Sequence, residues 1–104
     1  MSRSFNIHRD VRGVDLPPAL AYYRKADPSL PERFLADLDR AFDLVEEHPL
    51  IGHELFEVYR RVVLAHFPYL MAYRVTDSTI RVLALVHGRR DPDTIKAQIE
   101  LRST

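Results

Sequence analysis

The chain has 104 residues, the size of one domain, and its fifteen basic and fifteen acidic residues cancel at neutral pH. This balance argues against a strong, non-specific phosphate-binding protein, which would normally be basic overall. The absence of cysteine excludes a disulfide framework and a thiolate metal site. No apolar run approaches the roughly 18 residues of a membrane span. The length and the absence of cysteine, which fits a reducing cytoplasm, lead us to expect a single cytoplasmic domain over residues 1–104.

The N-terminal part of the chain predicts a short strand followed by a helix. Residues Ser4 to His8 alternate between polar and apolar side chains, as strands do, and Arg12-Gly13 breaks this pattern. Asp15 is then expected to cap a helix that continues to about Lys25. Two prolines follow Asp15, and a helix tolerates them there because they fall in its first turn.

The strongest helical pattern in the chain comes next. Ser29 and Glu32 have the spacing of a capping box at its start, and Pro49 stops it after His48. Its apolar residues recur at three- and four-residue steps: Phe34, Leu35, Leu38, Ala41, Phe42 and Val45. Its acidic residues are interpreted as a solvated face: Asp37, Asp39, Asp43, Glu46 and Glu47.

The second half of the chain changes to the period of β-strands. Aromatic and β-branched residues predict strands at Val58–Ala65, Phe67–Thr76 and Thr79–His87, and Asp77-Ser78 suits a tight hairpin between the last two. The central residues of this meander are apolar on both faces, so both faces must be covered. The two N-terminal helices can cover only one face. The other needs the C-terminal helix, a second copy or a partner.

A last short helix is predicted to begin with Asp91 as its cap and Pro92 at its first position. Ile95 and Ile99 are its clear apolar pair. The complete order defines an α+β fold with an N-terminal strand, a helical hairpin, a three-stranded antiparallel meander and a short C-terminal helix.

The charged residues are distributed unevenly along the chain. Residues 27–57 hold most of the acids, whereas the segment from Arg60 to Arg90 holds arginines and, among acids, only Asp77. We therefore expect the two halves to present opposite signs.

Several local features occur together in one order along the chain. They are Tyr22-Tyr23, His48-Pro49-x-x-Gly52, Phe67-Pro68-Tyr69 with Tyr73, and Leu85-Val86-His87-Gly88-Arg89-Arg90-Asp91. In this order the chain resembles the RelE/ParE toxins of type II toxin–antitoxin systems, from Ser4 to about Ile99. The resemblance implies one of two activities: RelE-type members cut messenger RNA on the ribosome, and ParE-type members inhibit DNA gyrase. It also implies an antitoxin that folds along the toxin surface and silences it.

Three positions distinguish the two branches. RelE-type toxins carry an arginine between the tyrosines of a central strand, where this chain has Leu70. They carry a second arginine after the last strand, which Arg89 matches, and many carry a C-terminal tyrosine where this chain has Ile95. Loss of a transition-state donor typically costs roughly 100-fold or more in rate. The resemblance therefore favours a ParE-like toxin that acts by binding, with plasmid stabilisation and growth inhibition as its implied effects.

Two alternatives stay open at this point. For a metal-independent endoribonuclease the candidate catalytic residues are His87, Arg89, Arg81 and Arg61, because arginine stabilises a phosphorane and histidine exchanges protons near neutral pH. Convergence of these four in one open cleft would favour that alternative. The other alternative is a structural relative without toxicity.

For a binding toxin, the expected target- or antitoxin-binding residues come from the basic segment. They are Arg60, Arg61, Arg74, Arg81, His87, Arg89 and Arg90. The expected partners are a cognate antitoxin and DNA gyrase, or the ribosome and mRNA under the ribonuclease alternative, with a homodimer as a further possibility. The antitoxin is expected to lay apolar residues over the second sheet face. We expect no cofactor and no metal, since no histidine pair has ligand spacing.

Overall fold

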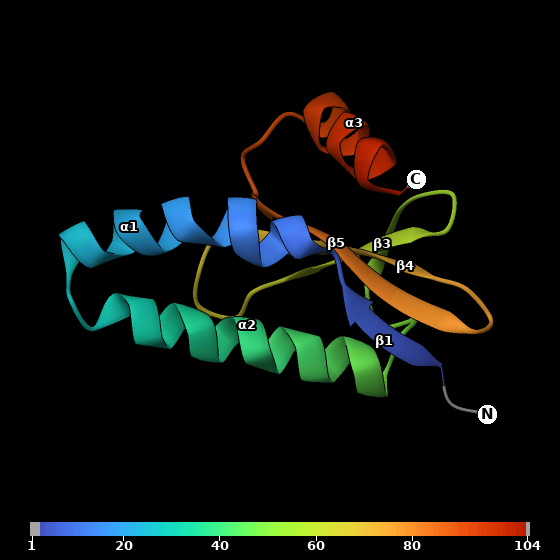
Figure 1. Ribbon diagram of the computed structural model, residues 1–104, viewed down its shortest axis with the longest axis horizontal. Helices are drawn as coiled ribbons and strands as arrows, with labels where there is room; N and C mark the ends of the chain where they lie inside the picture. The colour runs from blue at the N-terminus through green and yellow to red at the C-terminus, as the bar shows by residue number, and fades with distance from the viewer. Residues whose placement is uncertain (1–2, 104) are drawn as a thin grey trace.

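The computed structural model describes residues 3–103 and has a five-stranded mixed sheet with helices against it (Figure 1). The elements are β1 (Ser4–Ile7), a π-helical segment η1 (Val11–Asp15), α1 (Leu16–Ala26), α2 (Leu30–Glu47), β2 (His53–Phe56), β3 (Tyr59–Val63), β4 (Tyr69–Val75), β5 (Thr79–His87) and α3 (Pro92–Arg102). The strand order is β1-β5-β4-β3-β2, with β1 parallel to β5 and all other neighbours antiparallel. The predicted α+β class is confirmed.

The sheet contains one strand more than predicted, because β2 pairs with β3 as a hairpin. The turn between them is Glu57-Val58, which has none of the glycine or asparagine signals of tight hairpins. Glu57 nevertheless adopts a positive φ of 48°. The predicted first strand of the meander therefore begins one residue late, at Tyr59, and the loop before β4 is longer than the single His66 that was expected.

The predicted start of the first helix at Asp15 is wrong, because helical structure begins at Arg9 and runs on through η1, which contains Arg12-Gly13, into α1. In η1 the Leu16 N–H donates to the Val11 carbonyl, five residues back. The two prolines that follow have no N–H to offer the carbonyls of the preceding turn, which accounts for the wider π pattern. Val11 is fully buried and fixes this segment against the core.

Two predicted helix caps are also wrong, although the helices themselves are confirmed. Asp15 makes no capping hydrogen bond and lies inside the continuous helical segment. Ser29 makes none either; its N–H and Oγ both donate to the Asp27 carboxylate at 2.8 Å, so Asp27 organises the turn between α1 and α2. The third predicted cap, Asp91, is confirmed, because it accepts a hydrogen bond from the Thr94 N–H.

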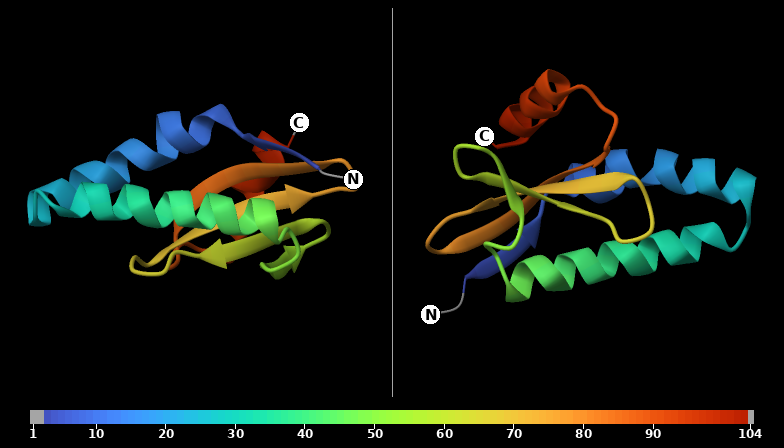
Figure 2. Two further views of the ribbon diagram at one scale, coloured as in Figure 1. Left: turned by 90° about the horizontal axis from the view of Figure 1, so that it is seen from below. Right: turned by 180° about the vertical axis from the view of Figure 1, so that it is seen from behind.

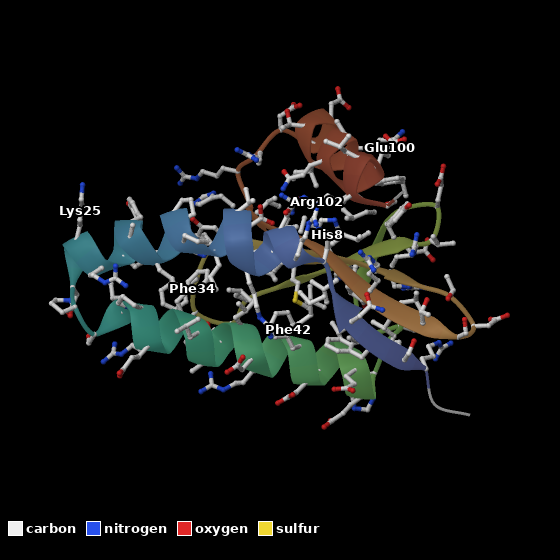
Figure 3. The ribbon with its side chains drawn as sticks, viewed as in Figure 1. His8, Lys25, Phe34, Phe42, Glu100 and Arg102 are labelled. Atoms are coloured by element: carbon white, nitrogen blue, oxygen red, sulfur yellow. The ribbon has the colours of Figure 1, made fainter. Side chains whose placement is uncertain are left out.

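The molecule has two apolar cores, one on each face of the sheet. The α1–α2 hairpin, which reaches beyond the end of the sheet in both views of Figure 2, packs on one face through residues that include Phe34 and Phe42 (Figures 2 and 3). On the other face, Ile95 and Ile99 of α3 pack on Leu70 and Leu83. The C-terminal helix is therefore the element that covers the second face.

A β-bulge in β5 shifts the face on which its residues lie. Ala72 pairs with Ala84, but the next residue of β4, Tyr73, pairs with Val82, so Leu83 is an extra residue. Leu83 and Ala84 therefore both lie in the core beneath α3. The strict alternation that a strand pattern assumes does not hold beyond this point.

The fully buried Tyr73 joins the sheet to the loop after α2. Its hydroxyl donates to the Pro49 carbonyl at 2.7 Å and accepts from the Gly52 N–H at 3.0 Å. A Cβ on Gly52 would lie 2.5 Å from that hydroxyl and 2.7 Å from the Arg61 carbonyl, so only glycine fits. Burial raises the pKa of Tyr73, which keeps the hydroxyl protonated. This contact gives the His48-Pro49-x-x-Gly52 motif a structural role.

We expect Tyr73→Phe to lower the free energy of unfolding by about 1–3 kcal/mol, because it leaves a buried N–H and carbonyl without their partner. Urea unfolding of the purified variant measures this. Tyr22→Phe, which removes the hydroxyl of an exposed tyrosine, is the matched control and should change stability by less than about 0.5 kcal/mol. Equal effects of the two variants would contradict the role given to Tyr73.

Candidate functional site

The predicted basic residues do not form a single site. Arg60 lies on the sheet face that the α1–α2 hairpin covers. Its guanidinium donates to the Gly52 carbonyl at 2.8 Å and pairs with Glu54 at 3.5 Å. Arg60 thus holds the β2–β3 hairpin against the loop after α2. This arginine supports the fold, which makes it a poor candidate for contacting a partner.

Two further arginines of the predicted set lie opposite each other on the α3 face. Arg74 pairs in register with Arg81. The Arg74 guanidinium donates to the Ser103 carbonyl at 3.4 Å, and the Arg81 guanidinium donates to the Asn6 side chain at 3.1 Å. Both side chains tie the chain termini to the sheet.

The bulge separates His87 from Arg81. An unbroken strand pattern places both on one face, and this expectation is wrong because Leu83 is inserted between them. His87 lies on the same sheet face as Leu85, the face that the α1–α2 hairpin covers. Its ring lies 5.2 Å from that of Tyr69. The four ribonuclease candidates therefore do not converge: His87 and Arg89 share one pocket, Arg61 lines another, and Arg81 lines neither.

The pocket beside α3 holds two of the three positions that distinguish the toxin branches, Leu70 and Ile95, whereas Arg89 lines the pocket of His87. The pocket beside α3 has a volume of about 390 Å³, and its lining includes Leu70, Ile95, Arg61 and Arg90. Leu70 and Ile95 are 3% and 7% exposed and pack together in the core under α3. The two positions where the resemblance implies an arginine and a tyrosine in RNA-cutting toxins thus form an apolar floor that itself offers no charge or proton. The cations of this pocket are Arg61, Arg90 and Lys96.

An ion pair that the sequence did not reveal fixes α3 in place. The Arg102 guanidinium binds both carboxylate oxygens of Asp15 at 2.6 and 2.8 Å and donates to the Leu83 carbonyl at 3.0 Å. The same carboxylate accepts the Leu85 N–H at 2.9 Å. Both side chains are less than a tenth exposed, and the hydrogen bonds to Asp15 raise the pKa of Arg102. Figure 3 shows Arg102 extending from α3 toward the start of the N-terminal helical segment, near His8.

The end of β5 presents the remaining candidates as an ordered turn. The His87 Nδ1 accepts the Arg89 N–H at 3.1 Å, and the His87 carbonyl accepts the Arg90 N–H at 3.0 Å. The Gly88 N–H donates to the Pro68 carbonyl at 2.8 Å. Arg89 and Arg90 are both exposed. The predicted group of His87, Arg89 and Arg90 is thus the part of the basic segment that the fold brings together and leaves accessible.

A second unpredicted cluster centres on Asp37, whose assignment to a solvated face is wrong. Its carboxylate is 1% exposed and accepts the His66 N–H at 2.7 Å, the His66 Nδ1 at 2.8 Å and the Arg40 guanidinium at 2.9 Å. Burial alone would raise the pKa of Asp37, but these hydrogen bonds and neighbouring charges lower it. Asp37 is buried because the loop between β3 and β4 lies over α2, and helical periodicity gives no sign of that loop.

Among residues 3–103, no group of three or more histidine, aspartate or glutamate side chains is placed to hold a metal ion. In the same range, no helix has the length and apolar character needed to cross a membrane.

The chain is similar to small α+β toxins of toxin–antitoxin systems. The family model for the ParE toxin of the type II toxin–antitoxin system parDE matches residues 15–92. Toxin ParE2 of Mycobacterium tuberculosis is 34% identical over 104 residues, which cover 99% of this chain and 98% of the relative. The chain therefore belongs to the ParE toxin family.

The chain is also similar to one further relative and to one solved structure. The putative toxin Y4kP of Sinorhizobium fredii is 31% identical over 71 residues, which cover 67% of this chain and 73% of the relative. A solved structure of the chromosomal ParDE TA system from P. aeruginosa superposes with a TM-score of 0.70 at 17% identity, covering 82% of this chain and 95% of that one. At this identity the structural match supports the fold alone.

We expect Asp37→Asn to lower the free energy of unfolding by about 1–3 kcal/mol at pH 7. The substitution removes the charge and replaces one of the two accepting oxygens by an NH2 group, which then faces a donor. The folded carboxyl has a lowered pKa, so its stabilising effect is present above the ordinary aspartate pKa of 3.8 and is lost as pH falls through the lowered value. Urea unfolding from pH 7 to pH 3 should show the difference from the parent protein shrinking below about pH 4.

The exposed neighbour Asp39→Asn is the matched control and should show little difference at any pH. A deficit in Asp37→Asn that stays constant down to pH 3 would contradict the assigned role of the Asp37 carboxylate.

Proposed function

We propose that this ParE-type toxin acts by binding and inhibiting DNA gyrase, and that a cognate antitoxin neutralises it in the cytoplasm. The observation that carries the proposal is the apolar floor formed by Leu70 and Ile95. A phosphorane needs a nearby cation and a proton donor. Arg61, Arg90 and Lys96 line this pocket, but among the described residues no histidine or tyrosine does, and Leu70 and Ile95 transfer no proton. Membership in the ParE family supports gyrase as the target.

The position of α3 changes where an antitoxin is expected to bind. The antitoxin was expected to cover the second sheet face, but α3 already occupies that face through Ile95 and Ile99. The accessible basic residues are instead Arg89 and Arg90 at the end of β5. We therefore expect a partner to contact the side of the molecule that carries the end of β5.

Two assays on one preparation of purified protein test the proposed activity. We expect inhibition of gyrase-catalysed supercoiling of relaxed plasmid DNA, with messenger RNA left intact in a translating extract. Co-purified product of a neighbouring antitoxin reading frame should restore supercoiling. Cleavage of transcripts with unaffected supercoiling would overturn the proposal in favour of an endoribonuclease, and inactivity in both assays would favour a non-toxic relative.

A further inference from the structure

We propose that a pocket between α2 and the loop from β3 to β4 binds a small organic phosphate through Arg33, Arg40 and His66. This pocket, called the α2 pocket below, has a volume of about 410 Å³. None of its lining residues lines the pocket beside α3 or the pocket of His87. The inference goes beyond the proposed function and does not depend on it, because the ligand is a small molecule and neither gyrase nor an antitoxin.

Three charged residues of α2 line the α2 pocket: Arg33, Asp37 and Arg40. They stand four and three residues apart, so they lie on one face of the helix. The two arginines are separated by about 10 Å along the helix axis, with Asp37 between them. The α2 pocket is therefore bounded by a cation at each end and a carboxylate in the middle.

The buried carboxylate of Asp37 holds two of the proposed ligand-binding groups side by side. Its Oδ1 accepts hydrogen bonds from the Arg40 guanidinium at 2.9 Å and from the His66 Nδ1 at 2.8 Å. Its Oδ2 accepts the His66 N–H at 2.7 Å. These bonds fix the ring and the guanidinium before a ligand arrives, which lowers the entropic cost of binding.

The hydrogen bond to Asp37 leaves the other ring nitrogen of His66 available. An ionised carboxylate can only accept, so Nδ1 carries the hydrogen and donates it. Nε2 has no hydrogen-bond partner within residues 3–103, and the side chain is 70% exposed. A phosphate monoester has a second pKa of about 6. It can therefore share a proton with Nε2 near neutral pH, where a histidine ring also exchanges protons.

The α2 pocket carries an excess of positive charge. The Arg40 guanidinium lies 2.9 Å from the Asp37 carboxylate and balances its charge. Arg33 is exposed, and within residues 3–103 its guanidinium is in no ion pair. The charge of Arg33 is therefore available to an anion, and a proton on His66 would add to it. Arginine binds phosphate oxygens with two parallel hydrogen bonds.

The remaining wall of the α2 pocket is apolar. Leu30, Ala36 and Phe67 line it beside the charged groups. Phe67 is buried and Leu30 is partly buried in the core under the α1–α2 hairpin. Small-molecule pockets combine such walls with a few polar groups and have volumes of about 300–1,000 Å³. A phosphate attached to an apolar body fits this arrangement better than a bare phosphate ion does.

Other anions fit these features less well. A nucleic acid would need many phosphate contacts, whereas the chain has no net charge and the α2 pocket presents two arginines and one histidine. A carboxylate or a sulfate ester carries a single negative charge near neutral pH and has no proton to share with Nε2. The phosphate monoester provides both the larger charge and the proton, so we assign it to this pocket.

The first experiment titrates the full chain with phenyl phosphate and follows the ring nitrogens of the histidines by NMR. We expect the Nε2 signal of His66 to shift until saturation, while that of the exposed His53 stays in place. Inorganic phosphate, which lacks the apolar body, should bind about 10-fold more weakly. Phenyl sulfate, which has the same shape, should also bind about 10-fold more weakly, because it carries one charge and no proton to share.

The second experiment repeats the titration with the variant Arg33→Gln. We expect the affinity for phenyl phosphate to fall about 10-fold, because a charge-assisted hydrogen bond is lost. The replaced side chain is exposed and in no ion pair within residues 3–103, so circular dichroism should show the variant folded like the parent protein. The matched control is Arg24→Gln, which removes an exposed arginine of α1 that does not line the pocket. It should change the affinity by less than about 2-fold.

The results that would overturn the inference are distinct. Unchanged binding by Arg33→Gln, or no shift of the His66 signal at saturation, would overturn the α2 pocket as the site. Equal affinities for phenyl sulfate and phenyl phosphate would overturn the phosphate monoester as the ligand, and equal affinities for inorganic and phenyl phosphate would overturn its apolar body. No binding of phenyl phosphate would overturn the whole inference. The gyrase assay tests the proposed function separately, so failure of one leaves the other standing.

Discussion

The buried ion pair between Asp15 and Arg102 is the interaction on which the arrangement of the whole molecule depends. The Asp15 carboxylate binds α3 through Arg102 and the end of the β5 bulge through the Leu85 N–H. The η1 segment carries that carboxylate to the sheet, so one side chain joins three elements that are distant in sequence. Removing one partner of such a pair leaves an uncompensated buried charge, which typically costs about 3–5 kcal/mol.

Because this pair holds α3 on the sheet, the chain covers both faces of its own sheet. Ile95 of α3 packs against Leu70 in this second core, and both are buried where the resemblance implies a tyrosine and an arginine in RNA-cutting toxins. What remains open beside the sheet is the side of α1 and the turn that carries the exposed Arg89 and Arg90.

The sequence predicted what depends on local pattern and missed what depends on long-range contacts. Apolar periodicity located α1, α2, β4 and β5, and the Asp91-Pro92 pair located the start of α3. The burial of Asp37 and the pairing of Asp15 with Arg102, 87 residues apart, depend on segments that no short window contains. The bulge at Leu83 reversed the expected face of His87, because strand alternation assumes that no residue is inserted.

The most direct test of this account is residue-resolved hydrogen exchange of the free chain compared with its Arg102→Gln variant. If the ion pair holds α3 on the sheet, the amides at the C-terminal end of α3 should exchange about 100-fold faster in the variant. The amides of α2 provide the internal reference and should change far less. Equal protection of α3 in the two proteins would show that α3 stays on the sheet without the ion pair, and would contradict the account.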